Sequence, residues 1–159
     1  MDIIGLFLVL CVSGYIIIVA LGSLVTKQYN MICDYKTLCH NIVLWGIDNV
    51  PPYKGVDKLN VMVLDKNKNK MANYYPHKRK IEIYMNSHYT VNEIVNTLLH
   101  EITHYKQHQT KPRTILKDYK KLLDVYGYEN HPMEKEANEN AVKYTEPCLK
   151  YLVKKKFIV

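Results

Sequence analysis

Paired cysteines are missing from this sequence. Its four cysteines, Cys11, Cys33, Cys39 and Cys148, form no CxxC pair of the kind that structural zinc sites use. Cys33 and Cys39 are compatible with a local disulfide in an oxidising compartment, and at least equally with buried free thiols. The absence of an Asn-x-Ser/Thr sequon counts weakly against a secreted eukaryotic glycoprotein. The chain also has no internal repeat and no long low-complexity linker.

Hydrophobic and basic residues dominate what is present. The 159 residues suit one compact domain with a short appendage, and the 48% hydrophobic content supports a packed core rather than disorder. Lys and Arg number 22 against 15 acidic residues, which gives a net charge of +7. This balance favours anionic partners, either lipid headgroups or nucleic acid, although a solvated basic surface explains it more simply.

The longest apolar run lies near the start of the chain. Residues Ile3 to Val25 carry no charge, and a membrane-spanning helix needs roughly 20 such residues. A cleavable signal peptide is the alternative, because Ala20-Leu21-Gly22 resembles a cleavage site. However, the run is longer than a signal core and no Lys or Arg precedes it. The run therefore predicts an uncleaved transmembrane anchor over residues 1–26 and a single-pass membrane protein that contacts the bilayer through residues 3–25.

Residues 27–58 form the predicted juxtamembrane region. Tyr35 to Ile47 has apolar residues at helical spacing and predicts an amphipathic helix. Lys27 and Lys36 outweigh Asp34 by one charge. The positive-inside tendency therefore places the following domain in the cytoplasm by a narrow margin.

Residues 59–159 predict an α+β domain in which a short sheet packs on helices. A capping box, Thr90 to Glu93, opens the first helix after the strands. Two further helices follow, and Pro147 is expected to kink or end the last of them near Thr145. The predicted strands are Asn60–Leu64, Met71–Tyr75 and Lys80–Met85, and the predicted helices are 90–109, 114–126 and 130–145.

The first helix of this domain contains the sequence HEITH. His100 and His104, four residues apart on one helix face, can bind a single zinc ion through their imidazoles. Glu101 is then placed to act as general base and take a proton from the attacking water. Zinc suits the reaction because it lowers the pKa of water and polarises a carbonyl. The motif therefore predicts a hydrolase with one catalytic Zn²⁺ and a peptide or protein substrate.

The helical context favours this interpretation over a chance match. At about 100° per residue, with His100 at zero, the histidines lie between about 0° and 80°, while the apolar residues occupy roughly 120° to 260°. The helix thus buries one face and turns the motif to the other. The strand just before the helix has an edge-like pattern that can pair with an extended peptide. The apolar residues are Val91, Ile94, Val95, Leu98, Leu99, Ile102 and Tyr105.

A catalytic zinc ion needs a third protein ligand and an open position. The pattern HExxHxxGxxH fails here, because Gln107 and Thr110 stand where Gly and His are required. His108 extends the histidine stripe but lies one turn too far along the same helix to complete the set.

The last helix offers better candidates for the third ligand. Glu134 lies on the flank of a face of small residues that permits close packing, and Glu136 is the fallback. The alternative role of Glu134 is a carboxylate that interacts with the helix dipole. Asn138, close to Glu134 on the helix, can orient a histidine ring by accepting its second N–H.

Two stretches resemble known metallopeptidases. TLLHEITHYKQH resembles the active-site helix of the gluzincin class, and PMEKEANENA resembles the downstream helix that carries the third ligand. The resemblance covers roughly residues 60–150 and implies a zincin-like fold, similar to ImmA/IrrE-like, SprT-like or HtpX-like catalytic domains. It implies the following roles: His100, His104 and Glu134 as metal ligands, Glu101 as general base, and Asn138 as the outer partner of a ligand, where several families have Asp.

The leading prediction is therefore a membrane-anchored zinc endopeptidase. One alternative is an inactive metal-binding pseudopeptidase that acts as a partner-binding module, which the intact Glu101 disfavours. Another is a nucleic-acid-associated protease, which the scattered lysines disfavour. An oxyanion donor is also required, and Tyr126, Tyr128 and His131 are the candidates because they lie in or beside the loop before the last helix.

Overall fold

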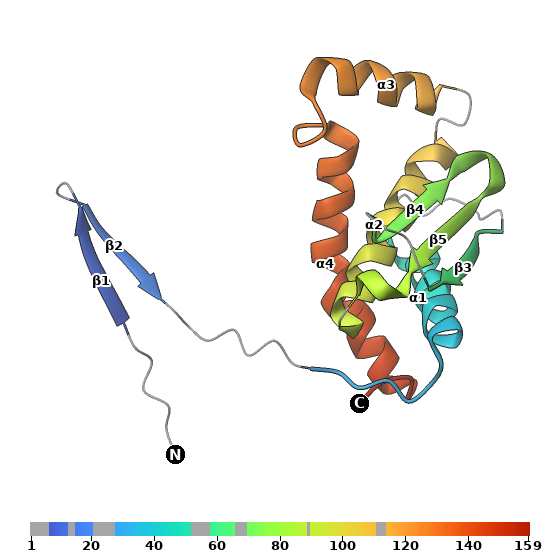
Figure 1. Ribbon diagram of the computed structural model, residues 1–159, viewed down its shortest axis with the longest axis horizontal. Helices are drawn as coiled ribbons and strands as arrows, with labels where there is room; N and C mark the ends of the chain where they lie inside the picture. The colour runs from blue at the N-terminus through green and yellow to red at the C-terminus, as the bar shows by residue number, and fades with distance from the viewer. Residues whose placement is uncertain are drawn as a thin grey trace.

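The computed structural model confirms an α+β domain and contradicts the predicted start of the chain. It describes residues 7–12, 15–20, 28–51, 58–65, 70–88, 90–110 and 114–159. The strands are β1 (Phe7–Val12), β2 (Tyr15–Ala20), β3 (Asn60–Leu64), β4 (Ala72–Tyr75) and β5 (Lys80–Tyr84). The helices are α1 (Tyr35–Asn49), α2 (Val91–Thr110), α3 (Ile115–Tyr126) and α4 (Pro132–Lys154), with short 3-10 turns η1 (Pro76–Lys78) and η2 (Met85–Ser87) (Figure 1).

The predicted transmembrane anchor is wrong. In its place β1 pairs antiparallel with β2, from Phe7 opposite Ala20 to Val12 opposite Tyr15. Among the described residues, no helix has the length and apolar character that crossing a membrane requires, so the single-pass localisation is overturned with it. The prediction measured apolar length alone, whereas these segments are rich in Val and Ile, whose branched Cβ favours extended backbone. Residues 1–6, 13–14 and 21–27 lie outside the described residues.

The three strands of the domain form one small sheet with the order β3-β5-β4. β3 runs parallel to β5, and β4 runs antiparallel to it. Each strand begins and ends at a predicted residue or the one next to it. However, β5, which precedes α2, is the central strand and not an edge. The edge strands of this sheet are β3 and β4.

The helices form the other part of the core. The capping box that opens α2 is present: the backbone N–H of Thr90 donates to Glu93 Oε2 at 2.8 Å, and that of Glu93 donates to Thr90 Oγ1 at 3.2 Å. All seven residues of the predicted apolar arc of α2 are buried, none more than 6% exposed. α2 contacts α1, α4 and the sheet, so it lies at the centre of the domain (Figure 1).

Helix α4 continues through Pro147, so the predicted end of the helix near Thr145 is wrong. A proline inside a helix removes one hydrogen bond and crowds the preceding turn. Packing outweighs this cost because the turn after Pro147 is buried: Cys148, Leu149 and Leu152 are at most 1% exposed. Beyond α4, the backbone of Phe157 and Val159 pairs with that of residues 30–32.

The cysteines of the α+β domain and of the segment before it, Cys33, Cys39 and Cys148, are free thiols. Cys33 is half-buried, Cys39 and Cys148 are buried, and no disulfide joins them. Burial raises the pKa of Cys39 and of Cys148 to about 12. These two thiols therefore behave as small apolar core residues.

Truncation of the α2 core face is expected to destabilise the domain. Leu98→Ala removes a side chain that is 0% exposed, so we expect the free energy of unfolding to fall by about 2–5 kcal/mol. Val142→Ala on α4, at a side chain that is 74% exposed, is the control and should change it by less than about 0.5 kcal/mol. Urea unfolding measures both. Equal effects would contradict the position of α2 in the core.

Candidate metal centre

Two helices that are distant in sequence bring the candidate ligands together. α2 carries His100 and His104 on the face opposite its buried arc. Glu134 lies in the first turn of α4, where His131 caps the helix by accepting a hydrogen bond from the backbone N–H of Met133 at 3.1 Å. Ala137, one turn further on, is 0% exposed, so this small residue allows α4 to approach α2 closely.

The potential ligand atoms of these residues converge. His100 Nε2 and His104 Nε2 lie 3.0 Å apart, and each lies 3.4 Å from one carboxylate oxygen of Glu134. All three residues offer a ligand atom within 4.8 Å of the others. The sequence prediction thus selected residues that meet in space, and Glu134 rather than Glu136 completes the group.

The chemistry of this group fits a metal cation. Glu134 Oε2 is buried and has no hydrogen-bond partner, which is costly unless a cation satisfies it. Two imidazole nitrogens and one carboxylate are a donor set of catalytic zinc sites. Ligands about 2.0–2.1 Å from a tetrahedral ion lie roughly 3.3–3.4 Å from one another, close to the separations found here.

Electrostatics within the cluster support a cationic centre. Burial acts to raise the pKa of Glu134, but the nearby His100 and His104 outweigh it and hold that pKa far below its usual range. Burial acts to lower the pKa of His104, but the nearby carboxylate of Glu134 outweighs it and raises that pKa. The carboxylate therefore stays ionised and attracts positive charge to this point.

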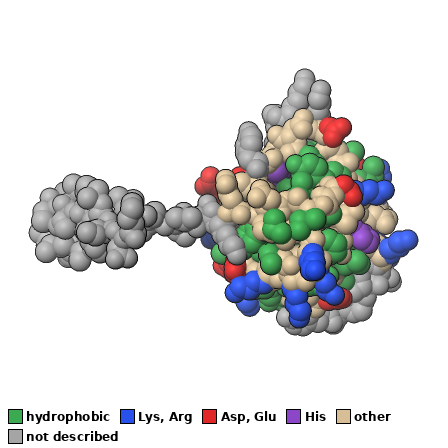
Figure 2. Space-filling model, turned by 90° about the horizontal axis from the view of Figure 1, so that it is seen from below, with side chains coloured by type: hydrophobic (Ala, Val, Ile, Leu, Met, Phe, Trp, Pro, Cys, Tyr) green, Lys and Arg blue, Asp and Glu red, His purple; other side chains and the backbone are tan. Residues whose placement is uncertain are grey.

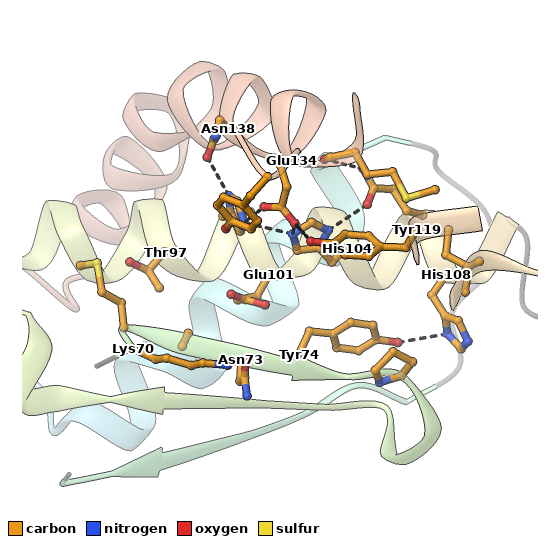
Figure 3. Close-up of a pocket in the computed structure, with 18 of the residues that line it drawn as sticks. Lys70, Asn73, Tyr74, Thr97, Glu101, His104, His108, Tyr119, Glu134 and Asn138 are labelled. Atoms are coloured by element: carbon orange, nitrogen blue, oxygen red, sulfur yellow. Dashed lines mark hydrogen bonds and ion pairs between the residues drawn. The ribbon is translucent and has the colours of Figure 1, made fainter. Parts of the chain in front are cut away.

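Glu101 lies beside the cluster and is not part of it. Figure 3 shows its carboxylate pointing from α2 toward β4, whereas His104 and Glu134 lie on the α4 side. Burial raises the pKa of Glu101, partly offset by the nearby His104 and His100 and by a hydrogen bond from the backbone of Tyr74. A raised pKa makes this carboxylate a stronger base at neutral pH.

A pocket of about 720 Å³ gives access to the cluster and to Glu101. One wall is β4 with the residues before it, and another is the polar face of α2 (Figure 3). The first turns of α3 and α4 complete the lining, so the predicted ligands, the predicted base Glu101 and Asn138 border one cavity.

Each histidine of the cluster has a partner for its other ring nitrogen. His100 Nδ1 lies 3.0 Å from Asn138 Oδ1, as the sequence predicted for Asn138. His104 Nδ1 lies 2.9 Å from Gln107 Oε1, a partner that the sequence analysis missed. Such contacts orient metal-binding imidazoles.

Tyr119 is a second residue that the sequence analysis missed. Its hydroxyl donates to Glu134 Oε1 at 2.8 Å. Its ring stacks on His131 at 4.1 Å between centroids. Helix α3 lies across the ends of α2 and α4 and thereby brings this hydroxyl to the site (Figure 1).

The other candidates differ in position. His131 is fully buried, and besides capping α4 its Nε2 bonds to the carbonyl of Tyr119 at 3.0 Å, so it is not free to stabilise an oxyanion. Tyr128 lines the pocket, whereas Tyr126 is 51% exposed and is not among the lining residues. His108 turns away from the cluster and bonds to the Tyr74 hydroxyl at 3.1 Å.

Comparison with known proteins does not assign a family. A scan against protein-family models found no match, and searches of the curated proteins and of the solved structures found none either. The resemblance to gluzincins therefore stays a prediction, and the functional argument depends on the chemistry of the site.

Proposed function

We propose that this chain is a zinc-dependent endopeptidase, with His100, His104 and Glu134 as metal ligands and Glu101 as general base. One observation carries the proposal. Two imidazoles converge on the carboxylate of Glu134, whose buried Oε2 has no hydrogen-bond partner, and the separate carboxylate of Glu101 lines the same pocket beside them. A metal site used only for structure is closed by protein ligands and has no need of an adjacent base.

The positions of the side chains indicate the chemical role of each group. When bound, zinc supplies Lewis-acid polarisation of the scissile carbonyl and lowers the pKa of water. Glu101, on the pocket side of α2, takes the proton from the attacking water and passes it to the leaving amine. Tyr128 borders the same pocket, and a tyrosine hydroxyl is a suitable donor to the developing oxyanion, whereas the hydroxyl of Tyr119 already donates to Glu134.

A peptide substrate fits the open edge of β4. β4 pairs with β5 on one side only, and no other described strand of this sheet pairs with its outer edge. Met71, Ala72, Asn73 and Tyr74 line the pocket along this edge. An extended peptide that adds to the edge as a further strand would pass beside Glu101.

The nucleic-acid alternative has no support on the surface that Figure 2 shows. On this face Lys and Arg side chains are interspersed with acidic, hydrophobic and neutral ones and form no continuous basic stripe. Recognition of a phosphate backbone requires such a stripe or patch.

Metal-dependent cleavage tests the proposal. The full chain is incubated with a peptide library before and after removal of metal by a chelator, and products are identified by mass spectrometry. We expect internal cleavage that is lost on chelation and restored by one equivalent of zinc. Zinc-loaded protein that cleaves no peptide would support the inactive metal-binding alternative, and cleavage that survives complete metal removal would exclude the mechanism.

A further inference from the structure

Gln107 links the two helices that carry the cluster. It follows His104 by three residues on α2 and is 7% exposed, and its side chain makes three hydrogen bonds to described residues. Its Oε1 lies 2.9 Å from His104 Nδ1, and its Nε2 donates to the carbonyl oxygen of Met133 and to Glu136 Oε2, each at 3.0 Å. These two acceptors lie on either side of Glu134, Met133 in the first turn of α4 and Glu136 just after it.

The partners on α4 decide which end of the Gln107 amide faces which helix. A backbone carbonyl and an ionised carboxylate can only accept hydrogen bonds, so the group that faces them must be the NH₂. The reversed amide would set its oxygen against two acceptor oxygens and leave the buried NH₂ against the ring. The amide oxygen therefore faces His104.

This orientation has a consequence for His104. The Gln107 oxygen accepts only, so His104 Nδ1 must carry the hydrogen between them. In the neutral ring the other nitrogen, Nε2, then has a free lone pair, and it is this atom that points at His100 and Glu134. The bond thus holds His104 in the tautomer that a metal ligand requires.

We propose that Gln107 is a positioning residue that fixes the tautomer of His104 and joins it to the turn of α4 that carries Glu134. The inference rests on the metal site of the proposed function, but not on catalysis. Gln107 differs here from Asn138, which is exposed and makes one side-chain hydrogen bond among the described residues, to His100. The amide of Asn138 is therefore not oriented by a second partner, and Gln107 is the stronger constraint.

Histidine ¹⁵N NMR of the metal-free full chain tests this directly, at a pH at which the imidazoles are neutral. We expect His104 to be predominantly the Nδ1–H tautomer in the wild type. Gln107→Met keeps the length of the side chain and removes the acceptor, so the Nε2–H form should rise markedly. Gln107→Glu keeps an acceptor for His104 but loses the donor to α4, so the Nδ1–H tautomer should persist.

Zinc affinity provides the second readout. We expect a roughly 10- to 100-fold loss for Gln107→Met, the range found when the outer partner of a ligand is removed. Gln109→Met, at a half-buried position on the same helix, is the matched control and should change neither readout.

If Gln107→Met does not fold, the tautomer of His104 in Gln107→Glu tests the inference on its own. An unchanged tautomer in Gln107→Met, or a lost Nδ1–H form in Gln107→Glu, would overturn the inference. A chain that shows these tautomers but cleaves no peptide would refute the peptidase and leave the role of Gln107 intact.

Discussion

Glu101→Gln is expected to abolish peptide hydrolysis while leaving zinc binding intact. Glutamine keeps the size and position of the side chain but cannot take a proton, so kcat should fall by at least about 10²–10⁴-fold. Zinc should remain because Glu101 lies beside the convergent group and not within it. The measurement compares kcat on a cleaved peptide with the zinc content of the same preparation.

An exposed carboxylate outside the pocket provides the control for the loss of one negative charge. Glu139→Gln, at an exposed position on α4, should retain both wild-type activity and zinc. Full activity of zinc-loaded Glu101→Gln would refute the assigned base. Loss of zinc together with activity would mean that Glu101 belongs to the ligand set, which its direction toward β4 argues against.

Glu134→Gln is expected to have the largest effect on metal binding. It removes the only carboxylate of the convergent group, and with it the negative charge that the two histidines hold ionised. Zinc affinity should therefore fall by more than the roughly 10- to 100-fold that loss of an outer partner costs. Competition with a chromophoric chelator measures the change.

Glu136→Gln separates this effect from a general change of charge on α4. Glu136 is exposed and is hydrogen-bonded to Gln107, which contacts the cluster, so the loss of zinc affinity in Glu136→Gln should stay within the range for an outer partner. A larger loss of zinc in Glu136→Gln than in Glu134→Gln would reverse the ligand assignment.

The parts of the site that were predicted are those that local periodicity determines. The period of α2 separates His100 and His104 from the buried arc, and both the capping box and the arc are found where the sequence indicates. The same reasoning placed Glu134 on the packed flank of α4 and Asn138 beside it. Each of these inferences uses residues within one helix, so it does not depend on how the helices meet.

The parts that were missed depend on contacts between elements. Tyr119 occupies an apolar position of α3, and only the placement of α3 across two other helices brings its hydroxyl to Glu134. Gln107 appeared only as a departure from a motif, yet it bonds to a turn 26 residues away in sequence. A single sequence carries no signal for either contact.

Two errors have a common physical origin. Hydrophobic length does not specify the backbone, and residues 7–12 and 15–20 form strands where a helix was predicted. Proline disfavours a helix locally, and the buried residues after Pro147 outweigh that preference in α4. In both cases one preference was considered alone. Apolar length was considered without β-propensity in the first case, and the helix-breaking tendency of proline without tertiary packing in the second.

The zinc content of the purified full chain tests the central claim most directly. Loosely bound metal is removed by dialysis, and bound metal is measured by mass spectrometry in the wild type and in a variant with both His100→Ala and His104→Ala. We predict about one zinc ion per wild-type chain and none in the variant. A folded wild-type chain without stoichiometric zinc, or a variant that retains it, would contradict the proposed site.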